Sequence, residues 1–529
     1  MKSNPNRLWL VAFALGWLFD FLFWEHEPGI NFAIYVILCL AGGMYILLGV
    51  EKAKPARNAL WLLIPILFFA TVTFIRAEPM TTVLAHFLTL FLMGVLVITY
   101  LGGRWIWYGL FDYLSGFLKL VGNMLSKPLT FSAELRKERT ERGDPPKRSI
   151  MPVVRGVLIA LPVIAIFASL LASADAVFDA RLQDFLDLLK IDNLAEYIFR
   201  ISYILIGAYL LVGVFLHAAR HSKDEELDTE KKSVIGQFLG FTESAIVLGS
   251  VAILFAIFVV IQFQYFFGGQ ANIHIDGYTY SEYARRGFGE LVAVAFFSLV
   301  LILGLGAITR RESGTQRNTF SVLSVGIVAL VLVMLFSAYK RLVLYETAYG
   351  FSELRTYTHV FMIWLGLLLI ATVVLEIIHR ERMFALAALI AAIGFAATLP
   401  ILNVDAFIVH QNVQRAVNGE ELDISYFTEL SADALPALVE AYHTKSLPDT
   451  VKDALGASLV CLHQNQTRAE ESQNTDWRSY HFSRWAQIGL LEKIQPELKD
   501  YRVYTADWPI LIVTPLGVKH NCGYGSFMD

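Results

Sequence analysis

The densest group of chemically active side chains lies in the segment Tyr-Thr-Tyr-Ser-Glu-Tyr-Ala-Arg-Arg-Gly-Phe-Gly-Glu, residues 278–290. It carries Glu282, Arg285, Arg286 and Glu290 directly before an apolar run. In a helix, Arg286 stands four residues from both glutamates and can pair with either of them. A guanidinium group also binds phosphate or carboxylate through two hydrogen bonds. The segment therefore predicts either an ion-paired helix cap or an anion site at a membrane boundary.

Other charged residues lie within apolar runs or directly after them. Asp20 stands near the end of the first run and Arg200 near the start of the sixth, while Asp405 and Arg415 follow the last one. A charge inside an apolar layer is costly unless it meets an opposite charge or water. We expect Asp20, Arg200, Glu290 and either Arg285 or Arg286 to approach one another at the outer end of the bundle. Asp405 and Arg415 would lie above them. The alternative is that each side chain reaches its nearest interface independently.

The cysteines indicate a disulfide rather than a metal site. Cys461 and Cys522 are the only cysteines after residue 403, and they would pair if that region lies in an oxidising compartment. Two separate buried thiols are the alternative. The chain has no Cys/His spacing typical of zinc ligands and no GxSxG, HExxH or P-loop motif. We therefore predict no metal and no cofactor, and the sequence does not favour an enzyme.

The composition is that of a membrane protein. Of 529 residues, 56% are hydrophobic and 17% charged, with a mean hydropathy of +0.53. Soluble domains carry about 25% charged residues. The net charge of −4 leaves no basic excess for neutralising phosphates, which excludes a nucleic-acid partner. The lipid bilayer is the expected environment.

The apolar runs predict about eleven transmembrane helices, because a spanning helix needs about 20 apolar residues. The runs are 8–24, 29–50, 58–75, 80–101, 151–174, 196–218, 242–267, 286–308, 319–339, 357–378 and 383–402. They define a four-span N-terminal part, 1–101, and a seven-span main bundle, 151–402. Between them, 102–150 reads as an aromatic interfacial helix followed, over 127–148, by a flexible cytoplasmic linker.

The last part, 403–529, has a soluble composition. Ser431 can cap one helix, Pro448-Asp449 can begin a second, and a third is expected near 476–492, before a β-rich or extended tail. Lys and Arg are concentrated in the loops on the N-terminal side of the membrane, which places the N-terminus inside and this part outside. The predicted fold is an all-α polytopic membrane protein with a small, mostly helical extracytoplasmic C-terminal domain.

Three stretches resemble a known family. They are Glu282 to Glu290, the sequence Asn403-Val-Asp-Ala-Phe-Ile that continues to Leu438, and Ser173-Ala-Asp-Ala-Val-Phe. Over roughly 150–490 the chain resembles a bacterial family of multi-pass membrane proteins of unknown function, the 4153/4173 domain-of-unknown-function group. The resemblance implies that the three stretches belong together, but it carries no assigned chemistry.

Three functions fit these observations. The first is a sensor or scaffold in the bacterial cytoplasmic membrane, with a polar site at the outer leaflet and an anionic lipid or an envelope protein as partner. The second is an outer-leaflet lipid-linked transferase. The third is a transporter or channel, which is disfavoured because the charged residues avoid the middle of the predicted spans, where coupled transporters carry theirs.

The predicted topology has a direct test. Reporter fusions at Ser126 and Lys223 should give a cytoplasmic signal, and a fusion at Asp529 an extracytoplasmic one, because eleven spans separate the two termini. A cytoplasmic signal at Asp529 would contradict both the orientation and the placement of the polar site.

Overall fold

The computed structural model describes most of the chain. The described residues are 5–142, 160, 167, 171, 175, 178, 181, 194–223, 236–267, 288–470, 476–504 and 510–522. The chain divides into two compact units. Unit 1 comprises Met1–Trp24, Leu38–Lys54 and Leu118–Ser222, and unit 2 comprises Glu25–Ile37, Pro55–Phe117 and Lys223–Asp529. These units cut across the predicted N-terminal part, because the first helix belongs to unit 1 and the third and fourth spans to unit 2.

The described part of the chain contains ten helices long and apolar enough to cross a membrane. They are Pro5–Phe23, Ile30–Val50, Arg57–Ile75, Pro79–Ile98, Glu196–Arg220, Phe241–Gln262, Gly289–Ile308, Gly314–Tyr349, Glu353–Ile377 and Phe384–Leu402. Each matches a predicted span. Most of the remaining predicted span, 151–174, lies outside the described residues. The polytopic all-α class is therefore confirmed.

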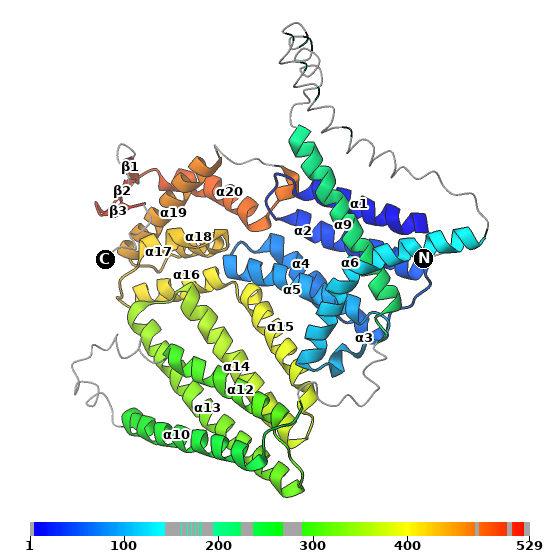
Figure 1. Ribbon diagram of the computed structural model, residues 1–529. Helices are drawn as coiled ribbons and strands as arrows, with labels where there is room; N and C mark the ends of the chain where they lie inside the picture. Colours follow the sequence, from blue (N-terminus) through cyan, green and yellow to red (C-terminus); the bar gives the residue numbers. More distant parts are fainter. Residues whose placement is uncertain are drawn as a thin grey trace. The chain divides into compact units, whose positions relative to one another are not determined.

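Unit 1 is built on the pairing of helix α1 (Pro5–Phe23) with α9 (Leu194–Arg220) (Figure 1). Leu8, Ala12 and Leu15 repeat at helical spacing and are buried. Gly16 allows the two backbones to come close, because a Cβ atom there would stand 2.8 Å from the Ile204 carbonyl oxygen. Helix α2 (Ile30–Met44) continues into a π-helical turn, η1 (Tyr45–Val50), which also contacts α1 and α9.

The predicted flexible linker is helical over most of its length. After the short 3-10 helix η2 (Arg104–Trp107), helix α6 runs unbroken over Leu110–Glu141. Within unit 1, Phe131 of α6 is buried, and Arg220 of α9 lies over its ring at 5.5 Å. Charged residues of both signs suit an exposed helix face as well as a linker, and these contacts with α9 favour the helix.

Unit 2 contains two groups of membrane helices. The first is α4 (Leu63–Ile75) with α5 (Pro79–Ile98), preceded by the short α3 (Arg57–Leu60). In the second, α13 (Gly314–Tyr349) contacts α10 (Phe241–Phe267), α12 (Phe288–Ile308) and α14 (Glu353–Ile377) (Figure 1). The 3-10 turn η5 (Glu381–Met383) then leads into α15 (Phe384–Leu402), which packs on α14 and also contacts α5. Buried apolar side chains of α13, from Phe320 to Leu342, form the centre of this core.

The C-terminal region of unit 2 is a set of short helices with a small sheet. The helices are α16 (Val404–Val417), α17 (Ile424–Glu429), η6 (Ala432–Ala434), α18 (Leu435–Tyr442), α19 (Asp449–Glu470), η7 (Trp477–Ser479), α20 (Phe482–Ile494) and η8 (Gln495–Leu498). The strands β1 (Arg502–Tyr504), β2 (Leu511–Val513) and β3 (Lys519–Asn521) form an antiparallel sheet in that order. Helix α16 contacts the ends of α14 and α15 and joins this region to the membrane helices (Figure 1).

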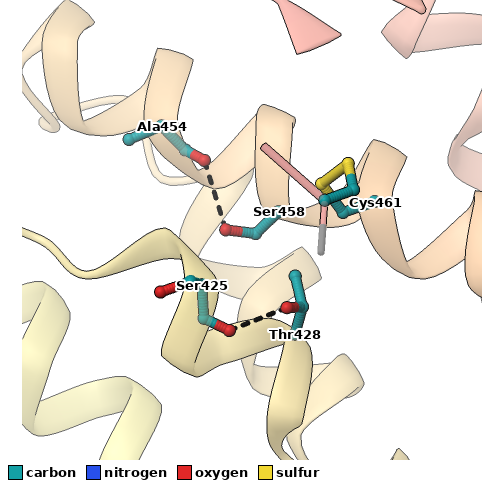
Figure 2. The surroundings of a disulfide bond; sticks show 6 residues. Ser425, Thr428, Ala454, Ser458 and Cys461 are labelled. Atoms are coloured by element: carbon teal, nitrogen blue, oxygen red, sulfur yellow. Dashed lines mark hydrogen bonds between the residues drawn. A yellow bond between two sulfur atoms is a disulfide. The ribbon is translucent and has the colours of Figure 1, made fainter. Parts of the chain in front are cut away.

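A disulfide joins Cys461 of α19 to Cys522, just after β3. Figure 2 shows this bond at Cys461, with Ser458 about one turn earlier in α19 and α17 beside it. Both cysteines are buried, and the Cys522 amide donates to the Ile510 carbonyl at 2.7 Å. Closing a loop of 61 residues stabilises a fold by about 4 kcal/mol in the chain-entropy treatment. The bond therefore fixes the sheet against α19.

Candidate functional site

Four carboxylic acids gather where several helices of unit 2 begin. Glu78 precedes α5, Glu353 begins α14, Asp405 lies in the first turn of α16, and Asp433 lies in η6. Helix N-termini attract carboxylates, because their first N–H groups have no partner within the helix and their dipole is positive there. We call these four residues the acid cluster.

A chain of hydrogen bonds connects the acid cluster across three elements. Asp405 accepts from the Ser431 amide at 2.9 Å, and Ser431 Oγ accepts from the Asp433 amide at 3.2 Å. Asp433 Oδ2 then accepts from the amides of Ala77 at 2.8 Å and Glu78 at 3.1 Å. The acid cluster therefore ties α16 and η6 to the segment that starts α5.

Two members of the acid cluster, Asp433 and Glu78, have hydrogen-bond donors or a cation beside their carboxyl groups. Asp433 lies 3.8 Å from the Arg76 guanidinium and accepts a hydrogen bond from the Ser483 hydroxyl. Glu78 caps α5 by accepting from the amides two and three residues later, and the Tyr357 hydroxyl also donates to it. Both carboxylates therefore have hydrogen-bond donors that replace lost water.

Among the described residues, only one oxygen of the Asp405 carboxyl group accepts a hydrogen bond. It is 0% exposed, and its Oδ1 atom receives no hydrogen bond from an N–H or hydroxyl group of the described residues. The carboxyl group of Glu353 faces it within hydrogen-bonding reach. Across the described residues, no arginine or lysine pairs with Asp405. A carboxyl group enclosed beside another one without a cation is more readily protonated.

The surroundings of Asp405 raise its pKa. Burial raises the pKa of Asp405 to about 6, and the charges of Glu78 and Asp433 act in the same direction. The hydrogen bonds from Ser431 oppose this shift, because they stabilise the charged form. Tyr426, whose hydroxyl accepts from the Glu353 amide at 2.8 Å, closes one side, and burial raises its pKa to about 12. Asp405 therefore changes charge near neutral pH.

The structure places Arg415 away from the acid cluster. It lies near the other end of α16, donates to the carbonyls of Thr347 at 3.0 Å and Ala348 at 3.3 Å, and stands 3.7 Å from Glu420. Arg415 thereby fixes the end of α13, where the last turn needs donors for its free carbonyls. The expected grouping of Asp405 with Arg415 is not seen, because about three turns of α16 separate them.

In unit 1, Asp20 and Arg200 form a two-pronged ion pair. Arg200 Nε donates to Asp20 Oδ1 at 2.9 Å, and Nη2 donates to Oδ2 at 2.7 Å. The Tyr203 hydroxyl donates to the same carboxylate, and the guanidinium lies 5.1 Å from the centre of the Trp24 ring. Glu196 adds a contact at 3.2 Å. The pair satisfies both charges within the α1–α9 contact.

The other residues of the predicted polar site lie in unit 2 or outside the described residues. Glu290 is an exposed residue in the first turn of α12, in unit 2. Glu282, Arg285 and Arg286 lie outside the described residues. In the described part of the chain, no group of three or more His, Cys, Asp or Glu side chains could hold a metal ion.

Sequence reasoning missed Glu78, Glu353 and Asp433. Two local signals were available: Glu78 stands directly before Pro79, as a helix cap does, and Asp433 follows the capping residue Ser431 by two positions. Both signals indicate helix starts. They do not indicate which helix starts adjoin, and that adjacency is what creates the acid cluster.

The Asp20–Arg200 pair can be tested by removing one charge at a time. D20N and R200Q should each destabilise the protein by about 3 kcal/mol, the low end for breaking a buried pair, because Arg200 keeps 27% of its side chain exposed. The double variant D20N/R200Q should lose less than the sum of the two. Thermal unfolding of purified protein, followed by tryptophan fluorescence, measures this. E290Q is the control and should change stability by less than about 0.5 kcal/mol. A loss in E290Q equal to that of D20N would contradict the pairing.

The titration of Asp405 predicts a pH-dependent stability. Its folded pKa, about 6, lies above its ordinary value of 3.8, so its contribution is present below pH 4 and is lost as the pH rises through 6. The loss is on the order of 3 kcal/mol. D405N stays neutral and keeps an acceptor for Ser431, so its melting temperature should exceed that of wild type increasingly from pH 4.5 to 7.5. E421Q, at an exposed glutamate, should follow wild type. Equal pH profiles for D405N and wild type would refute the assignment.

Comparison with known proteins places the chain in a family. A family model described as a domain of unknown function, DUF4153, matches residues 63–441, a range that contains the whole acid cluster. No curated protein and no solved structure matches the chain. The resemblance seen in the sequence is thereby confirmed, and the chain belongs to the DUF4153 family.

Proposed function

We propose that the protein is a sensor in the bacterial cytoplasmic membrane that responds to acidity outside the cytoplasm. Its N-terminus lies inside and its C-terminal helices outside. The observation that carries the proposal is Asp405, a fully buried carboxyl group whose Oδ1 atom accepts no hydrogen bond within the described part of the chain and which lies near the carboxyl group of Glu353. A group of this kind responds to protons without any further ligand.

Because Asp405 lies where α16 meets membrane helix α14, its charge affects the contact between these two helices. Asp405 and Ser431 belong to the C-terminal region, whereas Glu353 begins membrane helix α14. When protonated, Asp405 can donate to Glu353 and hold α16 on α14. When Asp405 loses its proton, its charge is repelled by those of Glu78 and Asp433 in an enclosed site. The repulsion is relieved if α16 and η6 move away from the membrane helices and let water enter.

The size of the effect is sufficient for a switch. A cost on the order of 3 kcal/mol changes an equilibrium between closed and open arrangements by about 100-fold. The neighbouring groups do not cancel it, because Asp433 already has Arg76 and Glu78 has its amide donors. Burial also lowers the pKa of the nearby His481, so this histidine is less readily protonated than an exposed one.

Hydrogen exchange of the full-length protein in lipid nanodiscs tests the proposal. After correction for intrinsic rates, amides of 404–434, including that of Ser431, should exchange faster at pH 7.5 than at pH 5 in the wild type. D405N should show the slower, closed pattern at both pH values, because its side chain cannot acquire charge. E421Q should repeat the wild-type response. The sensor proposal fails if wild type and D405N show the same corrected rates at both pH values.

A further inference from the structure

A second polar feature lies at the other end of α14. A cavity of about 680 Å³ opens where α12 ends, α13 begins and α14 turns into η5. Its charged and aromatic lining is Arg311, Arg317, His379, Arg380, Arg382 and Trp107. We call it the basic cavity. Acidic residues are absent from its described lining, which marks it as a site for an anion.

The backbone fixes where these cations stand. Helix α14 ends in a tight turn in which the Arg380 amide donates to the Leu375 carbonyl at 2.9 Å. His379 takes the left-handed conformation of this turn, with φ 55°. The Met383 amide then donates to the Arg380 carbonyl at 2.9 Å. The turn therefore holds Arg380 and Arg382 at the mouth of the cavity without help from a ligand.

One arginine has a structural role, and three remain for a ligand. Arg311 is half-enclosed by protein: it lies 3.8 Å from Glu376, donates to the Gly306 carbonyl at 2.9 Å and stacks 4.2 Å from the Phe320 ring centre. Arg317, Arg380 and Arg382 are exposed, and none of them forms an ion pair with a carboxylate whose side chain the structure describes. Three exposed guanidinium groups around one cavity repel one another unless an anion joins them.

We propose that the basic cavity binds the phosphate headgroup of an anionic phospholipid. Guanidinium groups bind phosphate oxygens in pairs, and the cavity has the volume of a small-molecule site rather than of a single inorganic ion. It opens at the ends of apolar helices, so acyl chains can continue along them. Trp107, 54% exposed, is the residue type that lies at the headgroup level. The Lys and Arg distribution predicts this side to be cytoplasmic, where anionic lipids attract basic sites.

The test is lipid binding to delipidated full-length protein in detergent, measured by native mass spectrometry. Phosphatidylglycerol should bind at least tenfold more tightly than phosphatidylcholine with the same acyl chains. R317Q/R380Q/R382Q should abolish this preference. K445Q/K499Q/R502Q removes the same number of charges from exposed positions in the C-terminal region and should retain it.

Two further measurements keep the proposal falsifiable. R317K/R380K/R382K keeps the charges but loses the planar guanidinium groups, so it should bind phosphatidylglycerol with intermediate affinity. This variant keeps the test valid even if the glutamine variant does not fold. Glycerol 3-phosphate, the headgroup without chains, should bind at least tenfold more weakly than the lipid. Equal affinity for glycerol 3-phosphate would indicate that the cavity binds a soluble phosphate compound instead of a lipid. An unchanged lipid preference in both arginine variants would show that the basic cavity is not the lipid site.

Discussion

The burial of the Asp405 carboxyl group is the constraint on which the junction between the C-terminal helices and the membrane helices depends. A fully enclosed carboxylate loses its hydration, and among the described residues only Ser431 donates hydrogen bonds to it. The charges of Glu78 and Asp433 add to this cost, so the protonated form of Asp405 is favoured. Contacts that hold α16 and η6 against α5 and α14 therefore include one whose strength is set by the surrounding pH.

The two units bury their carboxylates in different ways. In unit 1, Asp20 meets Arg200 through two hydrogen bonds, and a guanidinium group keeps its charge at every physiological pH. In unit 2, Asp405 has no such cation among the described residues and must lose its own charge instead. The first arrangement gives a constant link between α1 and α9, whereas the second gives a link that protons control.

The sequence was informative where one residue alone carried the signal. Asp20 and Arg200 each interrupt an apolar run, and the cost of such a charge suggested that they pair. The spans followed from hydropathy for the same reason. The acid cluster could not be found in this way, because Glu78 and Asp433 look like ordinary helix caps. Only the adjacency of four helix starts brings the four acids together. The helical part of 127–148 was hidden too, because its charged composition fits a linker until Phe131 is seen to be buried.

The acid cluster and the basic cavity lie at opposite ends of α14, and their separation limits how strongly one can affect the other. Its 25 residues span about 37 Å at the rise of an α-helix. At that distance two unit charges interact by only about 0.4 kcal/mol with an effective dielectric constant of 20. This is far below the roughly 3 kcal/mol that Asp405 experiences from its own surroundings. Titration at one end therefore cannot alter phosphate binding at the other through charge alone. Any coupling between the two ends would require α14 itself to move against α13 and α15, which pack along it.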